Sequence, residues 1–502
     1  MSTKGTESSP ETARDKLLAG LAAVAVGLGS LAIQFSFPQI IGSDGFFHIR
    51  MAYRPLGDMP WLPHTIFSTG WIDHQLLFHL LLKPFTLLLP GIAAAKAGAA
   101  VFAAVAVVAC YRLLRLEQCS SPLLFALLPI ALSWHFLLRL QMPRVQALSL
   151  ALLIWSLWAM SRERHRTLFV LSLLFGWLYH VAIILLPLSL VHFTIARKLR
   201  SGMEAAPSWR GPGAVLGGLI AAYLLHPHTP GTFRYLYQHV VLKVLNADQL
   251  PVGQEWLDGG LNALLMRGWP GLLALAAAAT LWWLARAQRS ELTTLFLVSA
   301  AAAQLGVLSS SRFIEYSIPL GTMSLALALR DLRPACSRLT PVLRKPATTV
   351  LLGMLLSWSA LQLHQAVSKE EPPPQRLAAV MAFAAEHVAA ESLLFHFSWN
   401  DFPELVFHGP QYRYISGLDP HFLGLHDPQL SELYQRIGRG WGNNPSKPIS
   451  ESFGADWALL VLPYPGAEQL LSDDRGLTEV FRDEAAILYR VEQDRSPKHS
   501  GP

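Results

Sequence analysis

Three side chains that can bind anions or move protons follow directly on the first apolar run of the chain. The segment 39–55 reads QIIGSDGFFHIRMAYRP and places Asp44, His48 and Arg50 within two helical turns of one another. A carboxylate can act as a general base, and an imidazole can pass a proton on. Gly45 permits a close backbone approach beside the acid. We therefore predict a catalytic role for Asp44, supported by His48.

The composition excludes an ordinary soluble enzyme. The chain has 502 residues, of which 52% are hydrophobic and 15% charged, and its mean hydropathy is +0.34. The net charge of +6 comes mostly from short Lys and Arg clusters between apolar runs, where such clusters set membrane topology. The sequence therefore predicts a polytopic α-helical membrane protein with no nucleic-acid partner.

The basic clusters predict the course of the chain through the bilayer. Placing each cluster on the cytoplasmic side requires about eleven transmembrane helices, with a cytoplasmic tail at 1–16 and the C-terminus outside. The expected spans lie near 17–37, 92–115, 122–139, 145–161, 167–179, 181–196, 213–225, 262–284, 291–309, 312–330 and 347–366. The spans on either side of Tyr179 and His180 are short, which predicts a cavity that opens to the outer face.

The remaining segments define the predicted domains. Residues 17–366 form the membrane domain, with outer loops at 38–91 and 226–261, and a proline-rich linker follows at 367–375. Short strand patterns within SLLFHFSW, YRYISG, DWALLVLP and AAILYRVE alternate with helical segments. We therefore expect a small extracytoplasmic α/β domain over 376–495 and a disordered tail over 496–502.

Further ionisable residues fall on the outer side of this topology. Arg139 and Arg144 either bind a phosphate or reach toward lipid headgroups. Arg312 and Glu315 lie about one helical turn apart and either form a site or pair with each other. The predicted substrate-binding residues are His74, His180 and His226, although His226 also suits a structural turn.

An acid, several arginines and an apolar wall suit a donor in which a polar head is joined to a long lipid through phosphate. Guanidinium groups bind phosphate through paired hydrogen bonds, which predicts Arg50, Arg139 and Arg312 as donor-phosphate ligands. Asp44 then acts either as general base, with Glu315 as a second catalytic acid, or as a metal ligand. In the second case Glu255 is the candidate partner for Mg²⁺ or Mn²⁺.

The segment SDGFFHIRMA resembles the first outer-loop signature of GT-C class glycosyltransferases, in particular the Asp-x-x-x-His-x-Arg pattern of oligosaccharyltransferase catalytic subunits. The long first loop, WIDHQLLFHLLL after it, the many spans and the outer tail agree with this resemblance. It implies that the first-loop acid, here Asp44, is catalytic base or metal ligand, and that sugar transfer inverts the anomeric centre.

Two departures separate the chain from the oligosaccharyltransferases. The tail lacks their Trp-Trp-Asp-Tyr-Gly motif, of which Trp399 and Asp401 are the nearest counterpart, and the outer loops lack a clear Asp-x-Asp metal motif. We therefore expect a glycosyltransferase of the bacterial inner membrane that moves a sugar or glycan from a polyprenyl phosphate or diphosphate donor to a periplasmic glycan, lipid or protein acceptor. A transporter or flippase of lipid-linked sugars and an inactive glycan-binding scaffold are the alternatives.

Overall fold

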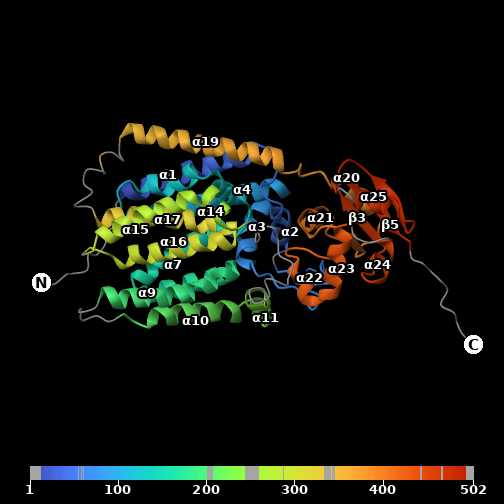
Figure 1. Ribbon diagram of the computed structural model, residues 1–502, viewed down its shortest axis with the longest axis horizontal. Coiled ribbons are helices and arrows are strands. Elements are labelled where there is room, and N and C mark those ends of the chain that lie inside the picture. Colours follow the sequence, from blue (N-terminus) through green and yellow to red (C-terminus); the bar gives the residue numbers. More distant parts are fainter. Residues whose placement is uncertain are drawn as a thin grey trace, which may run out of the picture.

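The computed structural model describes residues 13–54, 56–57, 59, 61–200, 207–242, 259–286, 288–332, 341, 345–440, 444–464 and 467–492. A bundle of helices occupies one end of the molecule and a C-terminal region with a β-sheet occupies the other, with α2 (Asp44–Tyr53) and α3 (Leu76–Leu88) where they meet (Figure 1). The predicted tail at 496–502, most of the tail at 1–16, and Glu255 lie outside the described residues.

The bundle helices follow the predicted spans closely in sequence. They are α1 (Ala13–Gln34), α4 (Gly91–Leu116), α5 (Pro122–Leu132), α6 (Trp134–Gln141), α7 (Gln146–Ser161), α8 (His165–Leu178), η1 (His180–Ile184), α9 (Leu185–Leu199), α10 (Arg210–Leu224), α14 (Leu261–Met266), α15 (Trp269–Leu284), α16 (Glu291–Ser309), η3 (Ser311–Phe313), α17 (Ile314–Asp331) and α19 (Pro346–Glu370). Four stretches of the described residues are long and apolar enough to cross a membrane: Gly91–Leu116, His180–Leu199, Glu291–Ser309 and Pro346–Glu370. The count of eleven spans stays a prediction.

Two breaks divide predicted spans, and a third lies between two of them, where the sequence predicted it. The chain is extended at Tyr179 between α8 and η1, where the sequence predicted a turn. The predicted span 122–139 is bent by 97° between α5 and α6. The hydroxyl of Ser133 caps α6 there by accepting a hydrogen bond from the backbone N–H of Phe136 at 3.1 Å. The span 262–284 divides at Arg267 and Gly268.

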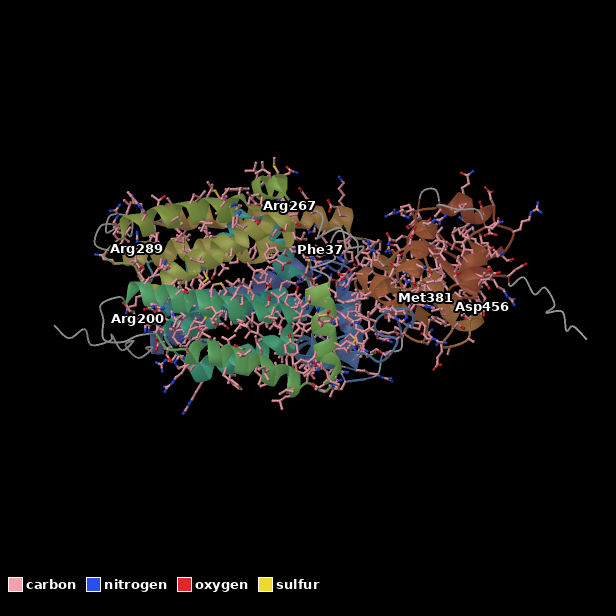
Figure 2. The ribbon with its side chains drawn as sticks, turned by 60° about the horizontal axis from the view of Figure 1, so that its bottom comes forward. Phe37, Arg200, Arg267, Arg289, Met381 and Asp456 are labelled. Carbon is pink, nitrogen blue, oxygen red and sulfur yellow. The ribbon has the colours of Figure 1, made fainter. Side chains whose placement is uncertain are left out.

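Basic residues gather at the end of the bundle remote from the C-terminal region. Figure 2 shows Arg200 and Arg289 at this end and Met381 and Asp456 at the opposite end of the molecule. The Arg200 guanidinium donates to Glu291 at 2.5 Å and to Glu163 at 2.6 Å, which joins the end of α9 to the first turn of α16 and to the connection between α7 and α8. The sequence prediction places these basic clusters on the cytoplasmic side, and this orientation stays a prediction.

The C-terminal region contains a mixed five-stranded sheet with strand order β2-β1-β3-β5-β4. Its strands are β1 (Leu393–His396), β2 (Arg413–Tyr414), β3 (Trp457–Val461), β4 (Leu477–Arg482) and β5 (Ala486–Val491), and β1 runs parallel to β2 and β3, whereas β5 runs antiparallel to β3 and β4. Helices α20 (Ala378–His387), α21 (Phe402–His408), α22 (His421–His426), α23 (Pro428–Gly438), α24 (Ser446–Glu451) and α25 (Ala467–Ser472) connect them.

Four strands fall within the predicted strand segments, and β4 was not predicted. Its register shifts between Glu479 and Phe481, so the apolar Val480 and Phe481 are adjacent rather than alternating. This bulge removes the period of two by which a strand is recognised in sequence.

The C-terminal region is joined directly to the first outer loop. The backbone N–H of Tyr414 donates to the carbonyl of Trp61 at 2.7 Å, and the Trp61 indole donates to the carbonyl of Pro410 at 2.8 Å. Immediately before α2, the N–H of Gly42 donates to the Glu371 carboxylate at 3.0 Å. These bonds fix α2, and with it Asp44, between the bundle and the sheet.

Acid is expected to destabilise the C-terminal region through His396. Its Nδ1–H donates to the carbonyl of Ser398 at 2.8 Å and its Nε2 accepts from the N–H of Ser416, which only the neutral ring can do together. Burial lowers the pKa of His396 to about 4. The unfolded chain therefore takes up a proton below its usual pKa of 6.5 while the folded chain does not, so stability is complete above that pH and falls by about 3 kcal/mol toward pH 4.

Thermal unfolding of the full chain between pH 7 and pH 4 measures this slope. The variant His396→Gln, whose side chain can donate and accept but does not titrate, is expected to flatten it. An equal slope in both proteins would assign the acid sensitivity to other groups.

Candidate functional site

A cavity of about 100 Å³ lies where the bundle, the first outer loop and the C-terminal region meet. Its lining comes from segments that are far apart in sequence: α2, the residues before α3, the connection between α6 and α7, the break before η1, the short helices α11 (Gly231–Leu236) and η2 (Tyr237–Leu242), η3, and residues 418–422. The lining side chains are Asp44, Phe47, His48, His74, Gln75, Arg144, Val145, Gln146, Tyr179, His180, Tyr235, His239, Arg312, Leu418, Asp419 and Phe422.

Asp44, the first residue of α2, is an accessible acid in the lining of this cavity. Its side chain is 42% exposed, and its Oδ2 lies 3.0 Å from Nε of Arg144, which is 10% exposed. A Cβ atom at Gly45 would come within 2.5 Å of Cγ of Pro143, so glycine allows α2 to approach the segment that carries Arg144. The predicted close approach is confirmed, and it places a guanidinium beside the carboxylate.

Behind His48 runs a buried chain of two imidazoles and one acid. Asp73 accepts a hydrogen bond from Nδ1 of His79 at 2.7 Å, and Nε2 of His79 lies 2.9 Å from Nδ1 of His48. Because a carboxylate only accepts, His79 must donate from Nδ1 and accept at Nε2, and His48 then donates from Nδ1. The remaining nitrogen of His48, Nε2, carries a lone pair. We call Asp73, His79 and His48 the relay.

Burial sets the charge of the relay at neutral pH. Desolvation lowers the pKa of His48 well below 6.5, and the nearby His79 and Arg144 lower it further. Burial alone would raise the pKa of Asp73, but the electrostatic interaction with the His79 ring and the hydrogen bond that this ring donates outweigh it, so this pKa is lowered. The relay therefore combines a neutral His48 with an ionised Asp73.

Aromatic and imidazole rings form a second wall of the cavity. The ring of His74 stacks on Tyr235 with a centroid distance of 4.5 Å and an angle of 18°, and the rings of His180 and His239 meet edge to face at 4.3 Å. Burial lowers the pKa of His74 to about 4, so its ring is neutral at pH 7. Flat rings with polar edges suit a sugar, which presents both C–H faces and hydroxyl groups.

Of the predicted site residues that the structure describes, five lie at this cavity and four lie outside its lining. The residues at the cavity are Asp44, His48, His74, His180 and Arg312. Arg139 and Glu315 pair with each other, with Nε 2.5 Å from Oε1, so Glu315 pairs with Arg139 rather than with Arg312. His226 accepts a hydrogen bond from the N–H of His228 at 3.2 Å, as a turn residue would. Glu255 lies outside the described residues.

Arg50, the fourth described residue outside the lining, lies in a separate groove, and helix geometry explains why. His48 follows Asp44 by four residues and shares its face of α2, whereas Arg50 follows by six and projects about 240° around the helix axis. Its guanidinium lies over the ring of Tyr53, 5.7 Å from the centroid. Arg50 is therefore close to Asp44 and His48 in sequence but lies on a different face of the helix.

Sequence reasoning missed Asp73 and His79 as site residues. The signal available was His79 itself, an imidazole within the otherwise apolar run LLFHLLL. A buried polar group requires a partner, and Asp73 lies just before the first turn of the same helix.

The acids of the described residues do not form a metal cage. Nowhere in the described part of the chain are three or more His, Cys, Asp or Glu side chains arranged to hold a metal ion, and Asp44 lies against the cation of Arg144. Because the predicted partner Glu255 lies outside the described residues, a divalent ion at Asp44 stays a prediction, and no step below uses one.

Comparisons with known proteins identify the fold. Neither a protein-family profile nor a curated protein sequence matches the chain. Among solved structures, the apo oligosaccharyltransferase of Archaeoglobus fulgidus superposes with a TM-score of 0.61 at 12% identity, covering 90% of this chain and 70% of its own. ArnT from Cupriavidus metallidurans bound to undecaprenyl phosphate gives 0.58 at 14% identity, covering 97% and 99%.

The arabinofuranosyltransferase AftD from Mycobacteria gives a TM-score of 0.59 at 16% identity and covers 96% of this chain, which in turn spans 40% of AftD. These superpositions establish the arrangement of the backbone. Sequence identities this low leave the substrate undefined. The resemblance predicted from the first outer loop is confirmed at the level of fold: this chain has the fold of the GT-C class of polytopic membrane glycosyltransferases.

Proposed function

We propose that the chain is a membrane glycosyltransferase that moves a sugar or glycan from a polyprenyl phosphate or diphosphate donor to an extracytoplasmic acceptor. The observation that carries the proposal is the cavity itself, in which Asp44 faces a space shared with Arg144 and Arg312 beside apolar helices. ArnT, which has the same fold, has been solved with undecaprenyl phosphate bound. Such a donor needs a cationic site beside lipid, as this cavity provides.

Two arginines hold the donor phosphate in this proposal. Arg144 and Arg312 both line the cavity. The bond from C1 of the sugar to the phosphate oxygen breaks with its electron pair on that oxygen, and guanidinium groups stabilise the negative charge that develops there. The lipid tail of the donor lies along the apolar helices, which keeps C1 near Asp44.

Asp44 accepts the proton of the acceptor hydroxyl as its oxygen attacks C1. Attack from the face opposite the phosphate inverts the anomeric centre. Arg144, whose Nε lies 3.0 Å from Oδ2 of Asp44, holds the carboxylate in place until the acceptor arrives. The acid thus serves as general base, which is the role that the first-loop resemblance implies.

The relay begins at His48, one helical turn from Asp44, and can accept the proton after Asp44 has taken it up. A proton added to Nε2 of His48 alone is disfavoured by burial. If His48 at the same time passes its Nδ1 proton to His79, the positive charge comes to lie 2.7 Å from the Asp73 carboxylate. The ion pair formed there stabilises the charge that His48 could not hold.

The proposal also assigns a location and an orientation. The basic end of the bundle faces the cytoplasm, and the cavity and the C-terminal region face the periplasm across an inner membrane. The acceptor, whether glycan, lipid or protein, reaches the cavity from that side. An oligosaccharyltransferase of the same fold has been solved with a tethered acceptor peptide.

Replacing Arg312 by lysine is expected to raise the KM for the lipid-linked donor about tenfold with a smaller change in kcat. Lysine keeps the charge but cannot form the paired hydrogen bonds of a guanidinium with phosphate. Transfer kinetics in proteoliposomes measure both constants, and Arg436→Lys on the exposed face of α23 is the matched control. A KM equal to that of the unaltered protein would remove Arg312 from the donor site.

Deletion of the gene tests the function itself. Cells that lack the protein should accumulate its lipid-linked donor, which extraction and mass spectrometry identify. If no lipid-linked sugar accumulates and no transfer is seen with purified protein, the proposed function is wrong.

A further inference from the structure

A second recess, larger than the cavity at Asp44, lies on the other side of α2. Its volume is about 740 Å³, and its walls come from the first outer loop and from residues 390–413 of the C-terminal region. The lining residues are Arg50, Tyr53, Arg54, Met59, Trp61, Ala390, Glu391, Pro410, Gln411, Tyr412 and Arg413. We call this recess the arginine groove.

The arginine groove is strongly basic. Three guanidinium groups, of Arg50, Arg54 and Arg413, line it together with a single carboxylate, that of Glu391. Within the described part of the chain, no ion pair joins any of the three arginines to an acid. Burial lowers the pKa of Arg50 from its usual value, as does the neighbouring Arg54. A cation that is partly desolvated beside another cation favours an anionic ligand.

Aromatic side chains give the groove a second property. Tyr53 is 38% exposed and lies under the Arg50 guanidinium, while Trp61 and Tyr412 are buried in the wall. The wall is fixed in place, because the Trp61 indole donates to the Pro410 carbonyl at 2.8 Å and Nε of Arg413 donates to the Glu391 carbonyl at 2.7 Å. An exposed aromatic ring between guanidinium groups suits a sugar ring that carries an acidic group.

We propose that the arginine groove binds an anionic saccharide, one whose sugars carry carboxylate or phosphate groups. The carboxylates form paired hydrogen bonds with Arg50 and Arg413, and a sugar face packs on Tyr53. Arg50 lies about 9 Å along the α2 axis from Asp44, so a saccharide of two or more units can reach around the helix toward the cavity. Its use as the acceptor rests on the proposed function, whereas the binding does not.

Binding is measured on the full chain in nanodiscs of neutral lipid, by fluorescence anisotropy with a labelled oligogalacturonate hexamer. We expect saturable binding, a Kd about tenfold weaker in Arg50→Gln and in Arg413→Gln, and no change in Arg436→Gln, which removes the same charge from the exposed face of α23. A labelled neutral maltohexaose should bind far more weakly than the acidic hexamer.

Three outcomes would overturn the proposal. Equal binding of the neutral hexamer would show nonspecific adsorption to the protein. Equal weakening by Arg436→Gln would show that only the net charge of the protein matters. In the third outcome, the hexamer no longer binds when phosphatidylglycerol replaces the neutral lipid, and the two groove variants retain less of this lipid than the unaltered protein does. This result would assign the groove to a lipid headgroup. Because anisotropy needs no turnover, Asp44→Asn should bind the hexamer normally, so failure of the proposed function leaves this measurement intact.

Discussion

Asp44→Asn is expected to abolish glycan transfer, with a loss on the order of 10²–10⁴ in kcat. Asparagine keeps the size and one acceptor oxygen of the side chain, but it cannot take a proton from the acceptor hydroxyl. Donor binding should change little, because Arg144 and Arg312 remain at the cavity. Transfer is measured with reconstituted protein and lipid-linked donor, and donor binding is measured separately on the same preparation.

Two controls sharpen this experiment. Asp473→Asn makes the same chemical change at an exposed position of the C-terminal region and should leave transfer unaltered. Chelation with EDTA separates the two roles proposed for the acid, and we expect transfer to survive it because Asp44 lies against Arg144 and the described residues form no cage of metal ligands around it. Full activity in Asp44→Asn would remove the central claim, and loss of activity in EDTA would make the acid a metal ligand.

Asp73→Asn is expected to lower kcat by about 10–100-fold while the KM for donor stays near its original value. The amide oxygen can still accept the hydrogen bond of His79, so the geometry of the relay is kept. Its negative charge is lost, however, and a proton that arrives on the relay is no longer stabilised. The side chain is buried and absent from the cavity lining, so it acts as a positioning and charge-compensating residue.

The pH profile distinguishes this role from a structural one. Activity should rise with pH as His48 loses its proton, with a midpoint below 6.5 because burial lowers that pKa. Removing the negative charge of Asp73 makes protonation still less favourable, so the midpoint in Asp73→Asn should move to lower pH. If the variant loses activity and thermal stability together and the midpoint of its pH–activity profile does not move, the relay has only a structural role.

The sequence predicted the helical segments and the central motif because both depend on residues close together in the chain. Apolar runs and basic clusters locate helices without reference to contacts, and Asp44 and His48 share a face by helical period alone. The break at Tyr179 was predictable for the same reason, since two full spans do not fit there.

The ion pairs and hydrogen bonds between distant parts of the chain could not be predicted from local sequence patterns. Glu315 has Arg312 close by in sequence and yet pairs with Arg139, which is 176 positions away, because the fold brings α6 to the start of α17. The relay likewise joins α3 to α2 through nitrogen positions that no spacing rule specifies. Partner choice among buried charges depends on tertiary packing, which a single sequence leaves open.

The hydrogen bond from Gly42 to Glu371 has a consequence for biogenesis. The loop that carries Asp44 emerges early in synthesis, but its partner Glu371, the carbonyl of Pro410 and the cavity residues at 418–422 emerge only after the last helix of the bundle. A nascent chain that stops at α17 therefore inserts its helices without a finished cavity. If the proposed function holds, the cavity is complete only after the C-terminal region has packed against the first outer loop, late in synthesis.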